Sequence, residues 1–155
     1  MWKFLTFRLL VGCFVTGYVP YSILSSHPAP ILTLLSPETV IGIFLIAAGL
    51  YVYLRCVWDF AFGSEGDNPT MLVARGTYKF VRNPMYASLV LILLGESLLF
   101  KSWRLLGYAS AIWIGVHLIV ILYEEQVLAK KFGASYEQYC KEVPRWIPRV
   151  RHSVS

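Results

Sequence analysis

Charge is scarce in this chain and is missing from long stretches of it. Asp, Glu, Lys and Arg make up 15% of the 155 residues, whereas hydrophobic residues make up 57% and the mean hydropathy is +0.58. Soluble domains carry about 25% charged residues, so the composition argues against a soluble globular domain. Long uncharged apolar segments are instead typical of membrane spans.

Cysteine is also scarce, and Cys13, Cys56 and Cys140 lie far apart. Their spacing fits neither a disulfide framework nor a metal site, so we predict no bound metal. The net charge is +5, but a nucleic-acid partner would need a basic face on a soluble fold. Here the basic residues flank apolar segments, where membrane topology and anionic lipid headgroups account for them. We therefore expect membrane lipids, and no nucleic acid, as partners.

Four apolar segments predict an all-α integral membrane bundle with about four transmembrane helices. They run over about residues 4–24, 37–57, 84–100 and 105–123. Ser36 is a candidate cap for the second segment, in which Gly42 and Gly49 permit close helix contact. From Glu124 onward the sequence is amphipathic and basic, which predicts a cytosolic helical tail.

The loop of residues 25–36 contains no lysine or arginine. The positive-inside rule places such a loop outside the cytosol, together with the short turn that holds Lys101 and Arg104. The N- and C-termini are then cytosolic, as in a multi-pass protein of a bacterial inner membrane. The first segment also resembles a signal peptide, but residues 25–30 form a poor cleavage site, so we expect a retained span.

Two polar clusters would meet at the cytosolic mouth of this bundle. They place aromatic rings, an arginine, an amide and two carboxylates in residues 76–86 and 124–148. S-adenosyl-L-methionine offers a carboxylate for an arginine, an ammonium for a glutamate, and an adenine and a sulfonium for aromatic faces. A nucleotide or a lipid headgroup can use the same groups.

Other readings of single residues remain open. The pair Glu124–Glu125 opposes the helix dipole, which argues against a passive role unless the basic tail neutralises it. His117 lies seven residues before Glu124 on the same expected helix face, as either a substrate-pocket residue or a buried structural histidine. For Glu96, at membrane depth, we expect a hydrogen bond to a neighbouring helix. Tyr136 and Tyr139 first suggest a helix packing face, with ligand contact second.

The two clusters resemble the isoprenylcysteine carboxyl methyltransferase family, whose clan includes phospholipid N-methyltransferases. The first half of the shared pattern is Leu-Val and then Gly-x-Tyr-x-x-x-Arg-His-Pro-x-Tyr, here Leu72–Val73 and Gly76–Tyr86. The second half is Glu-Glu, Phe-Gly-x-x-Tyr-x-x-Tyr and Val-Pro-Arg-x-x-Pro, here within residues 124–148. The resemblance covers about residues 40–150 of a single domain over residues 1–155, which looks like a short, bacterial-type member.

This resemblance implies a methyltransferase that uses S-adenosyl-L-methionine, with transfer to oxygen as the expected form. The cofactor residues that it carries over are Thr70, Met71, Leu72, Val73, Tyr78, Asn83, Pro84, Met85, Tyr86 and Glu124. Arg82 and Glu125 are candidate catalytic residues, and His117 is the candidate substrate residue. The expected acceptor is a lipophilic small molecule that enters from the bilayer; a protonated amine would need Glu125 or His117 as a base.

Two positions depart from the family pattern. Asn83 stands where the pattern has histidine, and it can hydrogen-bond but cannot ionise. Val120 stands one turn before Glu124, where prenylcysteine enzymes carry an arginine for the substrate carboxylate. These departures weigh against a prenylcysteine acceptor and leave methyl transfer itself as the expected activity.

Two rival functions remain. A sterol-reductase-like membrane enzyme would use NADPH, but the chain is short and has no additional basic cluster for a phosphate. A small structural or transport subunit would place charge along a midplane pathway, and here only Glu96 lies deep.

Overall fold

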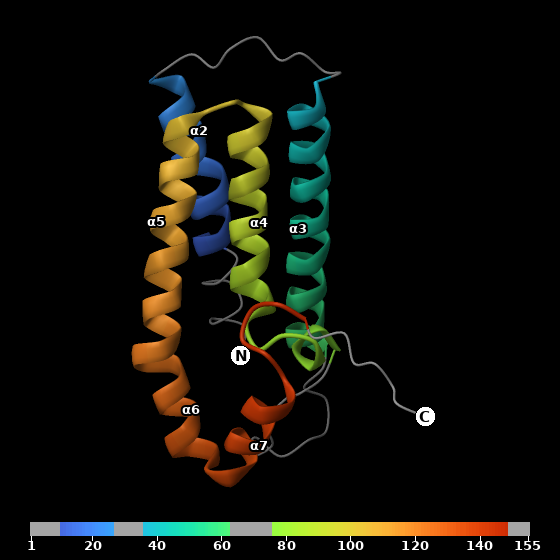
Figure 1. Cartoon of the computed structure of the whole chain (residues 1–155), viewed down its shortest axis with the longest axis vertical. Helices are drawn as coiled ribbons and strands as arrows, with labels where there is room; N and C mark the ends of the chain where they lie inside the picture. The colour runs from blue at the N-terminus through green and yellow to red at the C-terminus, as the bar shows by residue number, and fades with distance from the viewer. Residues whose placement is uncertain (1–9, 27–35, 63–75, 149–155) are drawn as a thin grey trace.

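The computed structural model describes residues 10–26, 36–62 and 76–148, and every regular element in them is helical (Figure 1). The elements are the π-helix η1 (Phe14–Tyr18), α2 (Val19–Ser25), α3 (Pro37–Phe62), the 3-10 helix η2 (Gly76–Lys79), α4 (Pro84–Leu99), α5 (Trp103–Ile119), the π-helix η3 (Val120–Glu124), α6 (Glu125–Phe132) and α7 (Ala134–Glu142). The prediction of an all-α fold is confirmed for these three ranges.

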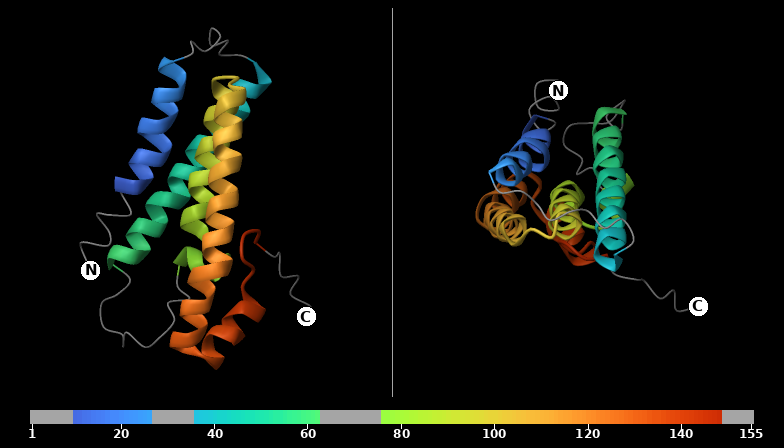
Figure 2. Two further views of the ribbon diagram at one scale, coloured as in Figure 1. Left: turned by 90° about the vertical axis from the view of Figure 1, so that its left-hand side faces the viewer. Right: turned by 90° about the horizontal axis from the view of Figure 1, so that it is seen from above.

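The central element of the bundle is α4, which packs against α3 on one side and α5 on the other. The N-terminal helix, residues Leu10–Ser25, packs on α4 and α5, and Figure 2 shows it beside α5 when the bundle is seen from above. A hydrogen bond of 3.2 Å from Tyr108 Oη to the carbonyl of Val15 joins it to α5. Because helices surround α4, Ser88 and Leu93 are almost completely buried.

Two helices are long and apolar enough to cross a membrane, Pro37–Asp59 and Trp103–Phe132. The apolar helices Leu10–Ser25 and Pro84–Leu99 are shorter, and the 16 residues of α4 span about 24 Å at 1.5 Å per residue. Large apolar side chains point outward along the bundle: Phe44 is 70% exposed and Trp103 is 84% exposed. Such outward faces suit contact with lipid tails.

The expected helix ends agree with the structure. Ser36 Oγ accepts the amide of Thr39 at 3.4 Å at the start of α3. Pro84 occupies the first turn of α4, where its missing N–H costs nothing. Gly133, with φ +53°, ends α6 and starts α7, so the tail turns back towards the bundle (Figure 1).

The Glu96 carboxylate has one oxygen that does not make the expected hydrogen bond. Its Oε2 atom is buried and has no hydrogen-bond partner within the described residues. The expected bond to a tyrosine or serine is therefore not made by this oxygen.

Backbone contact between α3 and α4 confirms the role of the small residues. A Cβ atom added to Gly42 would lie 2.8 Å from the carbonyl oxygen of Gly95, and one added to Gly95 would lie 2.7 Å from that of Gly42. Seven residues further along α3, a Cβ on Gly49 would lie 2.8 Å from the carbonyl oxygen of Ser88. These glycines let two helix backbones touch, which brings Tyr53 close to α4.

We expect Gly95→Ala to lower the unfolding free energy by about 1–3 kcal/mol, because the extra methyl group overpacks a backbone contact. Gly115→Ala on α5 is the matched control, since no atom lies within 4 Å of an added Cβ there. The control should be neutral or slightly stabilising, because alanine favours helix more than glycine does. Melting temperatures in detergent measure both; equal values would contradict the packing argument.

Candidate active site

Two neighbouring cavities lie where α3, α4 and the α5–η3 helix approach the C-terminal tail. The larger has a volume of about 540 Å³ and the smaller about 120 Å³. The residues that line both cavities are Tyr78, Arg82, Asn83, Glu124 and Leu128. Both polar clusters of the sequence therefore contribute to one hollow region.

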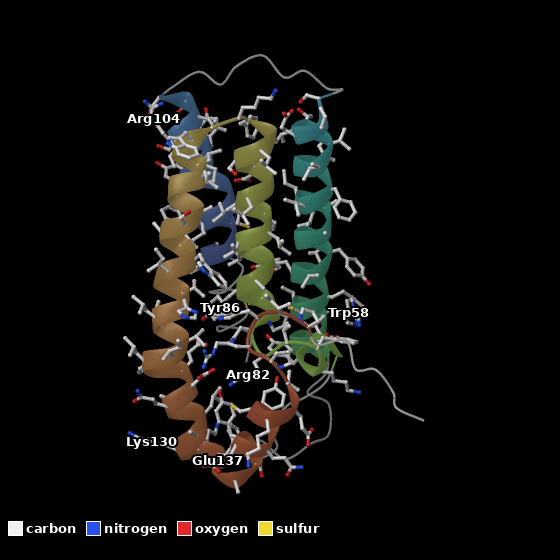
Figure 3. The ribbon with its side chains drawn as sticks, viewed as in Figure 1. Trp58, Arg82, Tyr86, Arg104, Lys130 and Glu137 are labelled. Atoms are coloured by element: carbon white, nitrogen blue, oxygen red, sulfur yellow. The ribbon has the colours of Figure 1, made fainter. Side chains whose placement is uncertain are left out.

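Tyr86 and Glu124 meet in the larger cavity. Tyr86 Oη donates a hydrogen bond of 2.6 Å to Glu124 Oε1, across 38 residues of sequence. Tyr86 lies in the first turn of α4, because Pro84 fixes where that helix begins, and Glu124 ends η3. Figure 3 shows Tyr86 and Arg82 at the same end of the bundle, far from Arg104. The two halves of the sequence pattern thus share a site.

The two adjacent glutamates lie at the end of a π turn and contact different residues. The amide of Glu125 donates to the carbonyl of Val120, five residues back, rather than four as in an α-helix. The extra residue widens the turn, and π turns of this kind often occur at functional sites. Glu124 faces Tyr86, whereas Glu125 faces Arg145 of the tail.

Glu125 is held between two arginines. Its Oε1 accepts Arg82 Nη1 at 3.0 Å and Arg145 Nε at 2.8 Å, and its Oε2 accepts Arg145 Nη2 at 2.8 Å. The side chains of Arg82, Glu125 and Arg145 are only 13%, 19% and 31% exposed, so solvent screens them little. The hydrogen bond to Glu125 raises the pKa of Arg145 above its usual range. Arg82 Nη1 also donates to Cys140 Sγ at 2.8 Å.

One hydrogen-bond donor of Arg82 is available to a ligand. Its Nε atom is buried and has no hydrogen-bond partner in the part of the chain that the structure describes. A buried donor without a partner costs about 1–3 kcal/mol. Since Arg82 lines both cavities, an anionic ligand group could satisfy this donor.

The segment after α7, residues 143–148, is held by hydrogen bonds on two sides. The Arg82 amide donates to the carbonyl of Pro144 at 2.9 Å, and Asn83 Nδ2 to that of Arg145 at 3.4 Å. On the other side, Trp146 Nε1 donates to His117 Nδ1 at 3.2 Å. We call residues 143–148 the C-terminal strap.

Asp59 fixes the turn that carries Tyr78. Its Oδ2 accepts the amide of Thr77 at 3.0 Å and the Thr77 hydroxyl at 3.2 Å. Gly76 has φ +55°, and a Cβ there would collide with the Asp59 carboxylate. Tyr139 Oη then donates to the carbonyl of Tyr78 at 2.8 Å, so the turn is held from α3 and from α7.

Tyr139 makes the stability of the fold depend on pH in the alkaline range. Burial raises the pKa of Tyr139 to about 12, against the opposing effect of Arg82, and burial also raises the pKa of Tyr136. The stabilisation is complete below the unfolded pKa of about 10 and is lost as the pH rises through the folded value. We expect the melting temperature of Tyr139→Phe to fall less than that of the native chain over this window. Tyr21→Phe, at an exposed tyrosine, should follow the native curve.

The structure places the expected site residues unevenly. Tyr78, Asn83, Met85, Tyr86 and Glu124 line the larger cavity, and Pro84 is buried at the start of α4. Arg82 and Glu125 form an ion pair rather than standing apart. Thr70, Met71, Leu72 and Val73 lie outside the described residues.

His117 is engaged by the C-terminal strap and does not line either cavity described above. Trp113 packs edge-on against Trp146 with ring centroids 4.6 Å apart, and both rings lie within 6 Å of the imidazole. Tyr136 and Tyr139 combine both readings, because they pack in the tail and also line the smaller cavity.

Sequence reasoning missed several residues that line the larger cavity, among them Val11 in the N-terminal helix and Tyr53 in α3. Both lie within uniformly apolar segments. Nothing in their local pattern distinguishes them from neighbours that face lipid.

The described residues form a helical bundle with two candidate membrane spans and a polar cavity at one end. Known proteins are similar to this chain in sequence. The profile of the phospholipid methyltransferase family matches residues 37–135. The protein-S-isoprenylcysteine O-methyltransferase of Schizosaccharomyces pombe (strain 972 / ATCC 24843) is 34% identical over 88 residues, which are 56% of this chain and 37% of that protein. The chain thus matches well under half the length of this relative.

The match over 37–135 covers more than half of the chain, so the chain belongs to the phospholipid methyltransferase family. Both the matching family profile and the relative are described as methyltransferases. The resemblance drawn from the two sequence clusters is confirmed.

Proposed function

We propose that this chain transfers a methyl group from S-adenosyl-L-methionine to a lipophilic acceptor at the cytosolic face of a membrane. The observation that carries the proposal is the 2.6 Å hydrogen bond between Tyr86 and Glu124 inside a cavity of about 540 Å³. This volume lies within the roughly 300–1,000 Å³ of small-molecule sites. The bond joins the two halves of the sequence pattern at one wall.

The residues at this wall fit the methyl donor chemically. The Glu124 carboxylate would pair with the ammonium of its methionine part, and Tyr86 holds that carboxylate in place. The Nε of Arg82, which has no hydrogen-bond partner among residues 10–26, 36–62 and 76–148, would donate to its carboxylate. The rings of Tyr78, Tyr136 and Tyr139 line the adjoining cavity and suit the adenine and the sulfonium.

The reaction that follows is direct displacement at the sulfonium methyl group. As the acceptor nucleophile, a carboxylate, an amine or a thiol, bonds to the methyl carbon in line, the bond from that carbon to sulfur would break and S-adenosyl-L-homocysteine would leave. A proton carried by an amine or a thiol would pass to solvent. The chain supplies alignment and exclusion of water. Glu125 already accepts three guanidinium N–H groups, so its contacts in this arrangement position Arg82 and the C-terminal strap.

We also propose that the two long and the two shorter apolar helices all span the membrane and that both termini are cytosolic. The cavity-lining Arg82 and Tyr86 lie towards the same end of the bundle as Lys130 and Glu137, while Arg104 lies at the opposite end (Figure 3). A cytosolic position gives the site access to a soluble methyl donor, and an acceptor can enter sideways from the bilayer.

The test is direct. The purified chain in detergent is incubated with radiolabelled S-adenosyl-L-methionine and a panel of lipids, thiols and prenylcysteine analogues, and the products are separated by chromatography. We expect label in a lipophilic product and a higher melting temperature with the methyl donor than with NADPH. Stabilisation by NADPH alone would favour a reductase and overturn the proposal.

A further inference from the structure

The larger cavity has one polar side and one apolar side. Besides Glu124 and the other polar residues, the lining includes Val11, Tyr53, Met85 and Leu89. Tyr53, Met85 and Leu89 belong to one buried hydrophobic cluster, which we call the apolar side of the cavity. Val11 belongs to the N-terminal helix, which lies before residues 37–135 of the family match. Part of the cavity wall is therefore built by a segment outside the matched range.

At this wall, the N-terminal helix touches α3 through Gly12 and Tyr53. A Cβ atom added to Gly12 would collide with the Tyr53 hydroxyl and lie 2.9 Å from its Cζ atom. Tyr53 is 7% exposed and packs in the core with Cys56, Met85 and Leu89. The core residues limit the movement of the Tyr53 ring. A side chain at position 12 must therefore either push this ring into the cavity or push the N-terminal helix away from α3.

The contact is local to Gly12. Five residues along the same helix, a Cβ added to Gly17 would meet no atom within 4 Å. Beyond the Gly12 contact, Tyr108 holds the helix to α5 through the carbonyl of Val15. The distance between Gly12 and α3 thus determines how wide the apolar side of the cavity is.

Resting on the proposed function, we propose that Gly12 and Tyr53 determine which acceptor tails the site takes. The apolar side receives the hydrocarbon tail of the acceptor between the N-terminal helix and α3, and the Gly12–Tyr53 contact limits the bulk of that tail. Gly12 is the specificity-determining residue, and its lack of a side chain keeps the Tyr53 ring against the helix.

The experiment varies the tail and holds the headgroup constant. The probes are N-acetyl-S-alkyl-L-cysteines from S-butyl to S-hexadecyl, and calorimetry measures their Kd for the full chain in amphipol. We expect Gly12→Ala to weaken the long-tailed probes by about 10- to 200-fold relative to the short ones, the range for a steric change of about one methylene. Tyr53→Ala should extend the range of accepted tails, and Gly12→Ala/Tyr53→Ala should restore long-tail binding. Gly17→Ala is the matched control and should leave the series unchanged.

The proposal is overturned if Gly12→Ala and Gly17→Ala give the same tail-length profile, if the double variant shows no recovery, or if no probe binds the native chain. Should Gly12→Ala fail to fold, Tyr53→Ala still decides, because an unchanged profile in that variant contradicts the proposal. The Kd of S-adenosyl-L-methionine is measured in parallel. If the native chain does not bind S-adenosyl-L-methionine but the probes show the expected dependence on tail length, the proposed function fails and this inference stands. If the methyl donor binds but the dependence on tail length is absent, only this inference fails.

Discussion

Replacing Glu124 with glutamine is expected to abolish measurable binding of S-adenosyl-L-methionine. The substitution keeps the shape of the side chain and an oxygen that can accept from Tyr86, but it removes the negative charge that would face the ammonium. Losing one partner of a shielded, hydrogen-bonded charge pair costs about 2–5 kcal/mol, which raises the Kd roughly 30- to 4,000-fold. Calorimetry in detergent measures the effect, and an unchanged Kd would refute the assignment of this wall.

Two variants isolate the cause. Glu137→Gln removes an exposed carboxylate in α7 and should leave the Kd unchanged, so a general effect of net charge is controlled. Tyr86→Phe removes the 2.6 Å bond but keeps the ring, and should weaken binding by only about 1 kcal/mol. Tyr86→Ala also removes the ring and should abolish binding.

Much of the fold was readable because it follows from hydropathy and helix-end chemistry. The third apolar segment, expected over residues 84–100, is α4 at Pro84–Leu99, because proline fixes its start. Gly42 and Gly49 were recognised as packing residues because only small side chains permit such close contact. The meeting of Tyr86 and Glu124 followed from the paired motifs.

Other features depended on geometry that no local pattern encodes. The expectation that His117 and Glu124 share a face assumed a regular helix, but the π turn at Val120–Glu124 lies between them. His117 instead meets Trp146, which the strap brings in from 29 residues away. The contact between Gly12 and Tyr53 depends on how two apolar helices pack. In both helices the residues that face lipid and those that face the cavity are similarly apolar, so the sequence does not tell them apart.

The ion cluster around Glu125 gives the second large effect. Glu125→Gln is expected to lower the unfolding free energy by about 3–5 kcal/mol, because it leaves two shielded arginines without a counter-charge. Arg145→Gln should cost less, since Glu125 keeps the 3.0 Å bond to Arg82. Glu38→Gln, at an exposed pair with Lys101, is the control and should leave the unfolding free energy almost unchanged, because solvent screens the pair. Denaturant unfolding measures all three.

The cluster also connects stability to the site, because Arg82 and Arg145 belong to the cavity wall and to the C-terminal strap respectively. If Glu125 joins them, the double variant Glu125→Gln/Arg145→Gln should be more stable than the sum of the two single effects predicts, since it removes one unpaired charge. Hydrogen exchange should show faster opening of residues 143–148 in Glu125→Gln than in Glu38→Gln. Equal exchange would mean that the strap is held by Trp146 and the backbone bonds alone, and that Glu125 has a task at the acceptor instead.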